Sequence, residues 1–339
     1  MATEEERFAG CLLGAAIGDA LGMGVAGCAR EEIASLGGCR DFAPSRGAAS
    51  INVPLGEIAD SEVGDLLQLG QWTDDTQLLL ALAESLIEEG GLFVPEAWAH
   101  KIVRWLNLGP RTPDISTVEA ALQLRTGAVL WDEAADPDGA SSSPAARVAP
   151  IGLFFSDPVE RRRAAVLQAQ VTHGRPEAQA GALAVAEAVA MAIGKGTGNR
   201  EQGTEAEGAA FLGKIAEVVA DESPDFGEFA RCLRLAQTLL EDEVEMETAI
   251  RVLGVSDWAR EAVPCALYCT ASAPADFETA LLQTINRTGG AVDSIAAIVG
   301  AVLGARQGMV VIPARWRAGV EDAAHIVDIA HQLYVLHRP

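Results

Sequence analysis

The sequence predicts an all-α protein that folds as one large helical domain. Hydrophobic residues make up 49% of the 339-residue chain but aromatic residues only 5%, so most apolar side chains are Ala, Leu, Val and Ile. Chains rich in Ala and Leu and poor in aromatic residues favour helices over sheets. Apolar residues recur with helical spacing along the whole chain, and no convincing strand alternation occurs.

The segment 76–89 illustrates the helical period, because Leu79, Leu82 and Leu86 fall on one face with Leu78 beside them. The same period predicts further helices at 96–107, 117–131, 160–170, 176–194, 208–220, 226–240, 245–253, 257–271, 275–286, 293–307 and 319–336. Loops are expected where Gly, Pro, Ser and Asp gather, at 37–70, 132–147 and 194–206. None of these loops has the character of an interdomain linker, so one domain is expected over residues 5–338.

The apolar run at 8–29 is predicted to be a core helix rather than a membrane span or a signal peptide. It contains Asp19 and follows an acidic segment, where a signal peptide would be basic. Its glycines recur every four residues, at positions 10, 14, 18 and 22. A row of glycines makes a groove without side chains, so a neighbouring helix can approach closely. The small residues of 293–307 predict equally close packing there.

The formal net charge is −23, which disfavours non-specific binding to nucleic acid or to an anionic membrane. The six cysteines form no CxxC pair and have no zinc-like spacing to the five histidines. Reduced, buried thiols in a cytoplasmic protein are therefore expected.

Two acidic motifs at predicted helix starts are the main candidates for chemistry. In the first, Thr73, Asp74 and Asp75 precede the helix over 76–89. An acidic helix cap explains one carboxylate, but two adjacent carboxylates beside hydroxyls also provide the hard oxygen ligands that Mg²⁺ prefers. In the second, Asp293 and Ser294 follow a glycine pair at another helix start, which an ordinary cap after a glycine turn would also explain.

Two loop–helix boundaries are weaker candidates for phosphate or ribose contacts. Residues 147–152 follow a Ser-rich loop, and residues 172–176 contain His173. Two other interpretations of the acidic motifs are a diphosphate-binding motif and a two-carboxylate glycosidase. A DDxxD diphosphate motif fails because Leu78 occupies its last position. A two-carboxylate glycosidase stays open, since a sequence does not reveal how far apart its carboxylates lie.

Taken in order, the motifs resemble the ADP-ribosylglycohydrolase family. The resemblance rests on residues 7–14 (RFAGCLLG), 18–22 (GDALG), 70–76 (GQWTDDT), 149–153 (APIGL), His173 with Pro176, and 289–301 (GGAVDSIAAIVGA). It spans nearly the whole chain, and it implies an orthogonal all-α fold with a two-Mg²⁺ site between helices.

The resemblance also implies the roles of individual residues. The expected metal ligands are Thr73, Asp74, Asp75, Asp293 and Ser294, and either Asp74 or Asp75 would also serve as the catalytic base. Substrate contacts are expected from Gly289, Gly290, Ser143 and His173. The expected partner is ADP-ribose, either free or attached to a protein or a small molecule, and the implied reaction is hydrolysis of its glycosidic bond.

Two alanines depart from the family pattern. Ala26 stands where many members have a glutamate, and Ala291 stands where the late motif has its first aspartate, a metal ligand. A methyl group cannot coordinate Mg²⁺, so one of the two metals is expected to be weakened or lost.

Several readings of these alanines stay open. The chain could hydrolyse its substrate with one metal and a different base. It could bind ADP-ribose or ADP-ribosylated partners without turnover, as a natural pseudoenzyme or because the alanines were engineered to trap a complex. It could also be a structural protein that reuses the fold.

Overall fold

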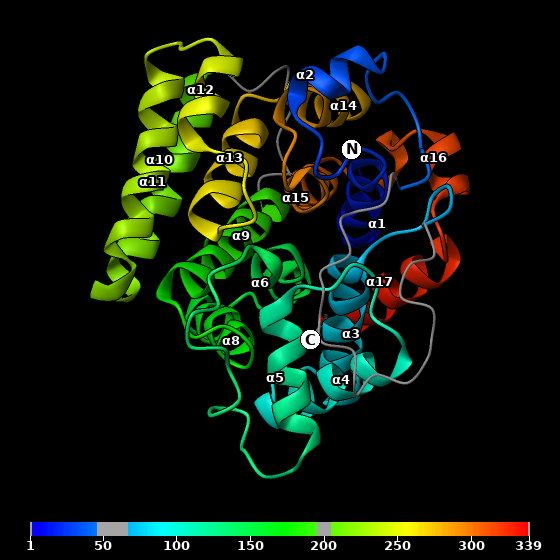
Figure 1. The fold of residues 1–339 in the computed structure, drawn as a ribbon, viewed down its shortest axis with the longest axis vertical. Helices are drawn as coiled ribbons and strands as arrows, with labels where there is room; N and C mark the ends of the chain where they lie inside the picture. Colours follow the sequence, from blue (N-terminus) through cyan, green and yellow to red (C-terminus); the bar gives the residue numbers. More distant parts are fainter. Residues whose placement is uncertain (1, 46–66, 195–204, 338–339) are drawn as a thin grey trace.

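The computed structural model describes residues 2–45, 67–194 and 205–337, and these ranges contain helices and connecting loops but no strand (Figure 1). The helices of the first half are α1 (Glu4–Met23), α2 (Arg30–Ser35), α3 (Asp74–Glu88), α4 (Pro95–Leu108), α5 (Ile115–Arg125), α6 (Ser143–Ala146), α7 (Ala149–Phe154), α8 (Pro158–Gln170) and α9 (Pro176–Gly194). Those of the second half are α10 (Glu205–Glu222), η2 (Pro224–Phe226), α11 (Gly227–Glu241), α12 (Met246–Leu253), α13 (Ala259–Ala271), α14 (Phe277–Thr288), α15 (Val292–Gln307), η3 (Met309–Val311), α16 (Ala314–Gly319) and α17 (Ala323–His337). The predicted all-α class is confirmed.

Several predicted boundaries were wrong, and local chemistry explains them. The first helix ends at Met23 instead of running to 29, and the chain then turns through Gly27, which has a φ of +76°. Helix α5 stops at Arg125, before Gly127 with its φ of +67°. The predicted loop over 132–147 contains the short helix α6, which is too brief to show a period.

Other differences concern the C-terminal region and the two remaining loops. The helix predicted over 319–336 begins only at Ala323, after the separate helix α16. The loops predicted at 37–70 and 194–206 lie mostly outside the described residues.

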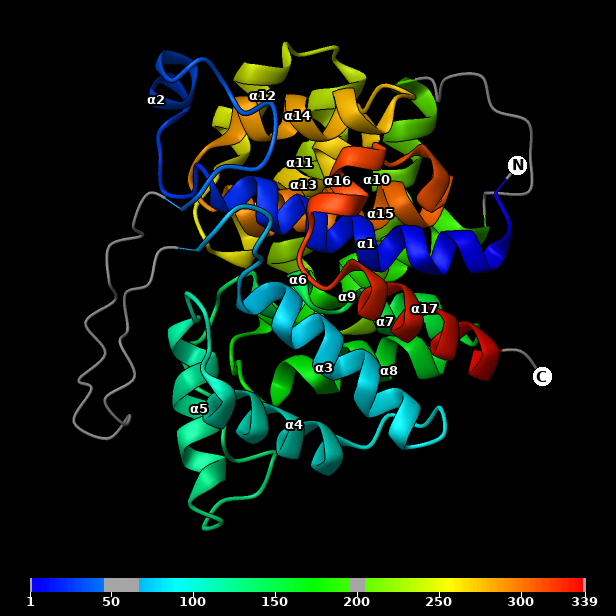
Figure 2. The same cartoon turned by 90° about the vertical axis from the view of Figure 1, so that its right-hand side faces the viewer.

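Helices α1 and α15 form the most extensive helix pair and lie side by side along their whole length (Figures 1 and 2). Their backbones touch where glycines face each other. A Cβ added at Gly14 would lie 2.2 Å from the Gly300 carbonyl oxygen, and one added at Gly304 would lie 1.9 Å from that of Gly10. The contacts run in antiparallel order, ending where Gly22 meets the backbone of Asp293. The predicted glycine groove is therefore the surface on which α15 packs.

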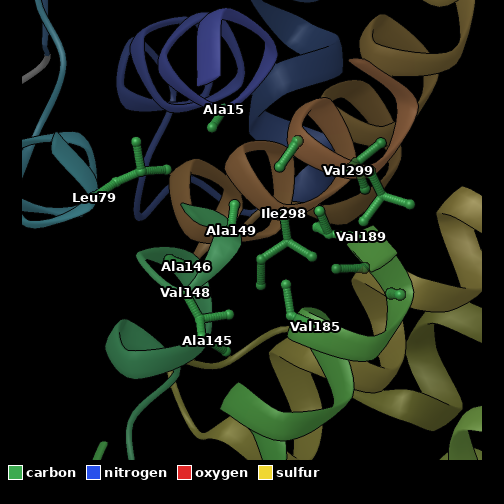
Figure 3. Close-up of a cluster of buried hydrophobic side chains, with 14 of the residues drawn as sticks. Ala15, Leu79, Ala145, Ala146, Val148, Ala149, Val185, Val189, Ile298 and Val299 are labelled. Carbon is green, nitrogen blue, oxygen red and sulfur yellow. The ribbon is translucent and has the colours of Figure 1, made fainter. Parts of the chain in front are cut away.

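The remaining helices surround this pair. Figure 2 shows α1 crossing the middle of the molecule, with α3, α4 and α5 on one side and α12 and α14 on the other. Helix α9 packs against α13 and α15 and against the α6–α8 segment. Ile298 and Val299 of α15 lie in an apolar cluster with Val185 and Val189 of α9 and Ala149 of α7 (Figure 3).

Within the described ranges, α9 is the one helix long and apolar enough to cross a membrane by length and composition. In this structure 67% of the apolar window is buried inside the protein, as in the core helix of a globular domain.

The substitution Gly14→Ala is expected to lower the free energy of unfolding by about 3 kcal/mol, because the new methyl group would meet backbone that cannot move aside. The matched control is Gly227→Ala, in α11, where no atom lies within 4 Å of the added Cβ. That control should be neutral or stabilise the protein by up to about 1 kcal/mol. Urea unfolding measures both, and equal effects of the two substitutions would contradict the close packing.

Candidate active site

The N-terminus of α3 carries the first acidic motif in a buried position. Thr73 is the N-cap, and its hydroxyl accepts a hydrogen bond of 3.2 Å from the backbone amide of Asp75. The side chains of Asp74 and Asp75 begin the helix but are almost wholly buried, at 5% and 4% exposure. Surface caps are normally solvated, so an N-terminus with two buried carboxylates has a purpose beyond capping.

Asp19 of α1 holds this helix start in place. Its carboxylate accepts hydrogen bonds from the amide of Thr73 (3.0 Å), the amide of Thr76 (3.2 Å) and the hydroxyl of Thr76 (2.6 Å). Burial raises the pKa of Asp19 to about 7, and the negative charge of Asp293 adds to that rise, although the hydrogen bonds from Thr76 and Thr73 oppose it.

The second acidic motif lies at the N-terminus of α15, against the first. The hydroxyl of Ser294 donates a 2.6 Å hydrogen bond to Oδ2 of Asp75, which is 219 residues away in the sequence. Burial raises the pKa of Asp75, and the negative charges of Asp19 and Asp293 raise it further. The structure thus brings together the two segments that the sequence singled out.

Asp74 is held by the connection between α4 and α5. Its amide donates to the carbonyl of Arg111 (3.0 Å), and its Oδ2 accepts from the amide of Asp114 (3.1 Å). Burial raises the pKa of Asp74 well above its usual value, and the charge of Asp75 adds to the rise. We call Asp19, Asp74, Asp75 and Asp293 the acid cluster.

Asp114, the N-cap of α5, links the acid cluster to His173. Its carboxylate accepts from the amide and hydroxyl of Thr117, both at 2.8 Å, and lies 3.2 Å from Nε2 of His173. Burial alone would raise the pKa of Asp114, but the charge and hydrogen bond of His173 and the hydrogen bonds from Thr117 bring it below its usual value.

Both ring nitrogens of the buried His173 are engaged with protein atoms. Nδ1 lies 2.8 Å from the hydroxyl of Thr172, and Nε2 lies 2.8 Å from that of Ser141. In this structure His173 supports Asp114 and Ser141, and its contact with substrate stays a prediction.

Arg147 provides a buried positive charge next to Thr172 and close to Asp114. Its guanidinium donates to Gln168 (2.9 Å) and to the hydroxyl of Thr172 (2.7 Å), and it lies 5.3 Å from the centre of the Trp98 ring. Burial lowers the pKa of Arg147 to about 10, while the nearby charges of Asp114, Asp74 and Asp75 oppose that shift.

The other predicted contact residues lie on loops around the cluster. The hydroxyl of Ser143 is buried and has no hydrogen-bond partner among the described residues. Gly289 and Gly290 have φ angles of +78° and +62°, and Gly290 exchanges backbone hydrogen bonds with Gly27 and Cys28. The positive φ angles and close packing of Gly289 and Gly290 thus explain the two glycines without a contact to substrate.

The two departures from the family pattern are neighbours in space. Ala26 directly precedes Gly27, whose amide donates to Gly290, and Ala291 directly follows Gly290. Ala291 occupies the N-cap of α15 without any side-chain cap, although its amide is bonded to Val255. Both missing carboxylates would therefore belong to the same edge of the site.

A cleft of about 500 Å³ reaches the site through Asp114. Its lining includes the half-exposed ring of Trp258, with the guanidinium of Arg260 at 4.5 Å from the ring centre, and the side chains of Arg175 and Ser141. The cleft lining combines this ring and two arginines with four acidic residues, Asp114, Asp138, Glu177 and Asp257. The ring suits stacking on an aromatic base, whereas the net charge of the lining does not by itself favour phosphates.

Two residues of the site were missed by sequence reasoning. Asp19 had a readable signal, because a single acid inside an apolar helical run must find partners when it is buried. Asp114 had no distinctive signal, since an aspartate before a helix is an ordinary N-cap.

Across residues 2–45, 67–194 and 205–337, no three His, Cys, Asp or Glu side chains are arranged so that they could hold a metal ion. A metal-binding role for the acid cluster therefore stays a prediction.

Comparison with known proteins identifies the fold and the family. The sequence profile of the ADP-ribosylglycohydrolase family matches residues 1–339. The chain is 37% identical to an uncharacterized protein from Archaeoglobus fulgidus, over 98% of this chain and 97% of that protein.

Two relatives with named activities are also similar over most of their length. ADP-ribosylhydrolase ARH3 from Bos taurus is 27% identical over 97% of this chain and 92% of its own length. ADP-ribosylarginine hydrolase Tri1 from Serratia proteamaculans is 27% identical over 98% of this chain and 80% of its own length.

Among solved structures, a chain of an ADP-ribosylglycohydrolase-related protein complex superposes with a TM-score of 0.73 at 25% identity, covering 98% of this chain and 99% of its own. The predicted fold type is thereby confirmed. The chain belongs to the ADP-ribosylglycohydrolase family of enzymes.

Proposed function

We propose that this protein is a Mg²⁺-dependent hydrolase that removes ADP-ribose from a modified side chain or a small acceptor. The observation that carries the proposal is the 2.6 Å hydrogen bond from Ser294 to Asp75, which joins the starts of α15 and α3 inside the acid cluster. The names of the relatives support the reaction class, since both ARH3 and Tri1 are named as ADP-ribosyl hydrolases.

The donor set of the acid cluster fits Mg²⁺. Asp19, Asp74 and Asp75 are buried, and Asp293 is partly buried. Burial raises the pKa of all four carboxyls, and repulsion from neighbouring carboxylates adds to the rise for Asp19, Asp74 and Asp75. The hydroxyls of Thr73 and Ser294 lie among them. A hard divalent cation relieves such repulsion and prefers oxygen ligands. Thr73, Asp74, Asp75, Asp293 and Ser294 would hold it once their side chains rotate to bring the oxygens together and the hydrogen bond between Ser294 and Asp75 opens. Bound Mg²⁺ would supply a positive charge that orients the ribose hydroxyls and lowers the pKa of water.

The protein's own groups would do the rest. The carboxylate of Asp74 or Asp75 takes a proton from the attacking water as the water oxygen bonds to ribose C1, and the bond between C1 and the acceptor breaks through an oxocarbenium-like transition state. The acceptor leaves with the bonding electron pair and takes up one proton, so the proton held by the aspartate is returned overall to the acceptor. The backbone amide of Asp114 holds Oδ2 of Asp74, and Arg147 provides a nearby buried positive charge. The cleft beside Asp114 would receive the adenine and diphosphate, with Trp258 as the stacking surface. Such positioning lowers the barrier by fixing the reacting groups before the reaction begins.

A second candidate function follows from Ala26 and Ala291. With two carboxylates absent from one edge of the site, the chain would bind ADP-ribose without hydrolysing its linkage. Calorimetry with ADP-ribose, combined with the turnover assay below, separates the two candidates. Binding without turnover supports the second one.

The substitution Asp75→Asn should lower turnover of a mono-ADP-ribosylated arginine or serine peptide by about 100-fold or more, because it removes both a base and an anionic ligand. Addition of a chelator should abolish turnover by the unaltered protein. Asp157→Asn makes the same chemical change at the exposed N-cap of α8 and serves as the control. If the folded protein turns over neither peptide with Mg²⁺ present, the proposal is wrong for these substrates.

The substitution Ala291→Asp should tighten Mg²⁺ binding by about tenfold, since each added anionic oxygen ligand raises the affinity of a hard-cation site. Isothermal titration with MgCl₂ measures the change. Ala29→Asp changes the same residue type at the N-cap of α2 and is expected to have no effect. An unchanged affinity in Ala291→Asp would contradict the placement of Ala291 at the metal-binding edge.

A further inference from the structure

Three segments that are far apart in the sequence meet just before the acid cluster. They are residues 70–72, which lead into Thr73, the loop around Arg111 between α4 and α5, and the connection from α16 to α17 around Glu321. We call the paired side chains of Arg111 and Glu321 the Arg111–Glu321 clamp. Neither residue belongs to the acid cluster or lines the cleft.

Arg111 contacts the acidic motif through its backbone and its side chain. Its carbonyl oxygen accepts the amide of Asp74 at 3.0 Å, and its own amide donates to Oε1 of Gln77, one turn further along α3, at 3.0 Å. Its guanidinium donates to the carbonyl oxygen of Trp72 at 3.3 Å and lies 4.7 Å from the centre of the Trp72 ring.

Glu321 binds both Arg111 and the segment before Thr73. Its carboxylate accepts from two guanidinium nitrogens of Arg111, so the pair is bidentate. Oε1 also accepts from Gln71 (3.1 Å), and the backbone of Glu321 accepts from the Trp72 indole (3.2 Å) and donates to Gly70 (2.9 Å).

The backbone beneath the clamp is equally close. Gly70 has a φ of +76°, and a Cβ there would lie 2.0 Å from the carbonyl oxygen of Gly319. The chain therefore enters Thr73 along a single path, held by Glu321 on one side and by Arg111 on the other.

We propose that Arg111 and Glu321 are positioning residues that set the geometry of Asp74 and Asp75 from outside the site. Bidentate arginine–carboxylate pairs fix the relative orientation of both partners, which a single hydrogen bond does not. Here the partners come from two different connections, and both of them also bind the chain that presents the carboxylates. The proposal rests on the proposed function, because the geometry matters most if these carboxylates hold Mg²⁺ and activate water.

A purely structural ion pair would behave differently from the clamp. Both side chains are about one-quarter exposed, and breaking a pair with a purely structural role would change only the free energy of unfolding. A structural pair would therefore leave catalysis unchanged. A positioning pair would lower kcat while leaving KM nearly unchanged, because neither residue touches the cleft.

The test is a double-mutant cycle of Arg111→Gln, Glu321→Gln and both together. Each single substitution should lower kcat by about tenfold, since small displacements of reacting groups cost that much or more. The double substitution should be no worse than either single one, because the two residues act as one unit. The control is Glu278→Gln, which breaks the bidentate pair with Arg315 on the surface and should leave kcat unchanged.

Two readouts do not depend on turnover. In both single variants, MgCl₂ titration should show weaker binding, and amide hydrogen exchange across residues 70–76 should be faster. These readouts keep the clamp testable even if the wild type hydrolyses neither peptide, a result that counts against the proposed function alone. The proposal would be wrong if both single variants kept the wild-type kcat, Mg²⁺ affinity and hydrogen exchange rates. It would also be wrong if the loss of kcat in the double variant equalled the product of the two single losses.

Discussion

The backbones of α1 and α15 touch directly, and that contact places two members of the acid cluster, Asp19 and Asp293, relative to each other. Glycines at both faces remove the side chains that would hold two helices at their usual distance of 8–10 Å. The contact runs from Gly10 and Gly304 to Gly22 and Asp293. It therefore sets the position of Asp19, near one end of α1, relative to Asp293 at the start of α15.

Helix α3 completes the arrangement, because the carboxylate of Asp19 binds its N-terminus. The carboxylate of Asp19 satisfies the amides of Thr73 and Thr76 and thereby fixes where α3 begins. Asp75 then meets Ser294, and Asp74 meets the amide of Asp114. The result is a concentration of buried negative charge that apolar packing alone would not favour. Burial raises the pKa of every member, and repulsion within the cluster adds to the rise for Asp19, Asp74 and Asp75. Such a cost in stability is typical of functional sites.

The sequence pattern predicted the all-α class, and the family resemblance implied that the two acidic motifs converge. Apolar residues recur with helical period along the whole chain. The row of glycines in α1 predicted the close packing that the structure shows between α1 and α15. The short helices α6 and α7 escaped prediction because one or two turns contain no measurable period. Asp114, Arg111 and Glu321 escaped it for a different reason. Each has an ordinary local explanation as a cap or a surface charge, and its role depends on contacts with distant segments, such as that of Glu321 with Gln71, 250 residues away.

The proposed mechanism depends on a divalent cation held jointly by the starts of α3 and α15. Crystals grown with MnCl₂ test it most directly, because Mn²⁺ accepts the same oxygen ligands as Mg²⁺ and gives an anomalous signal. The account predicts an anomalous peak bounded by the oxygens of Asp75, Asp293 and Ser294. A well-ordered site with the Ser294–Asp75 hydrogen bond intact and no anomalous peak beside it would contradict the account.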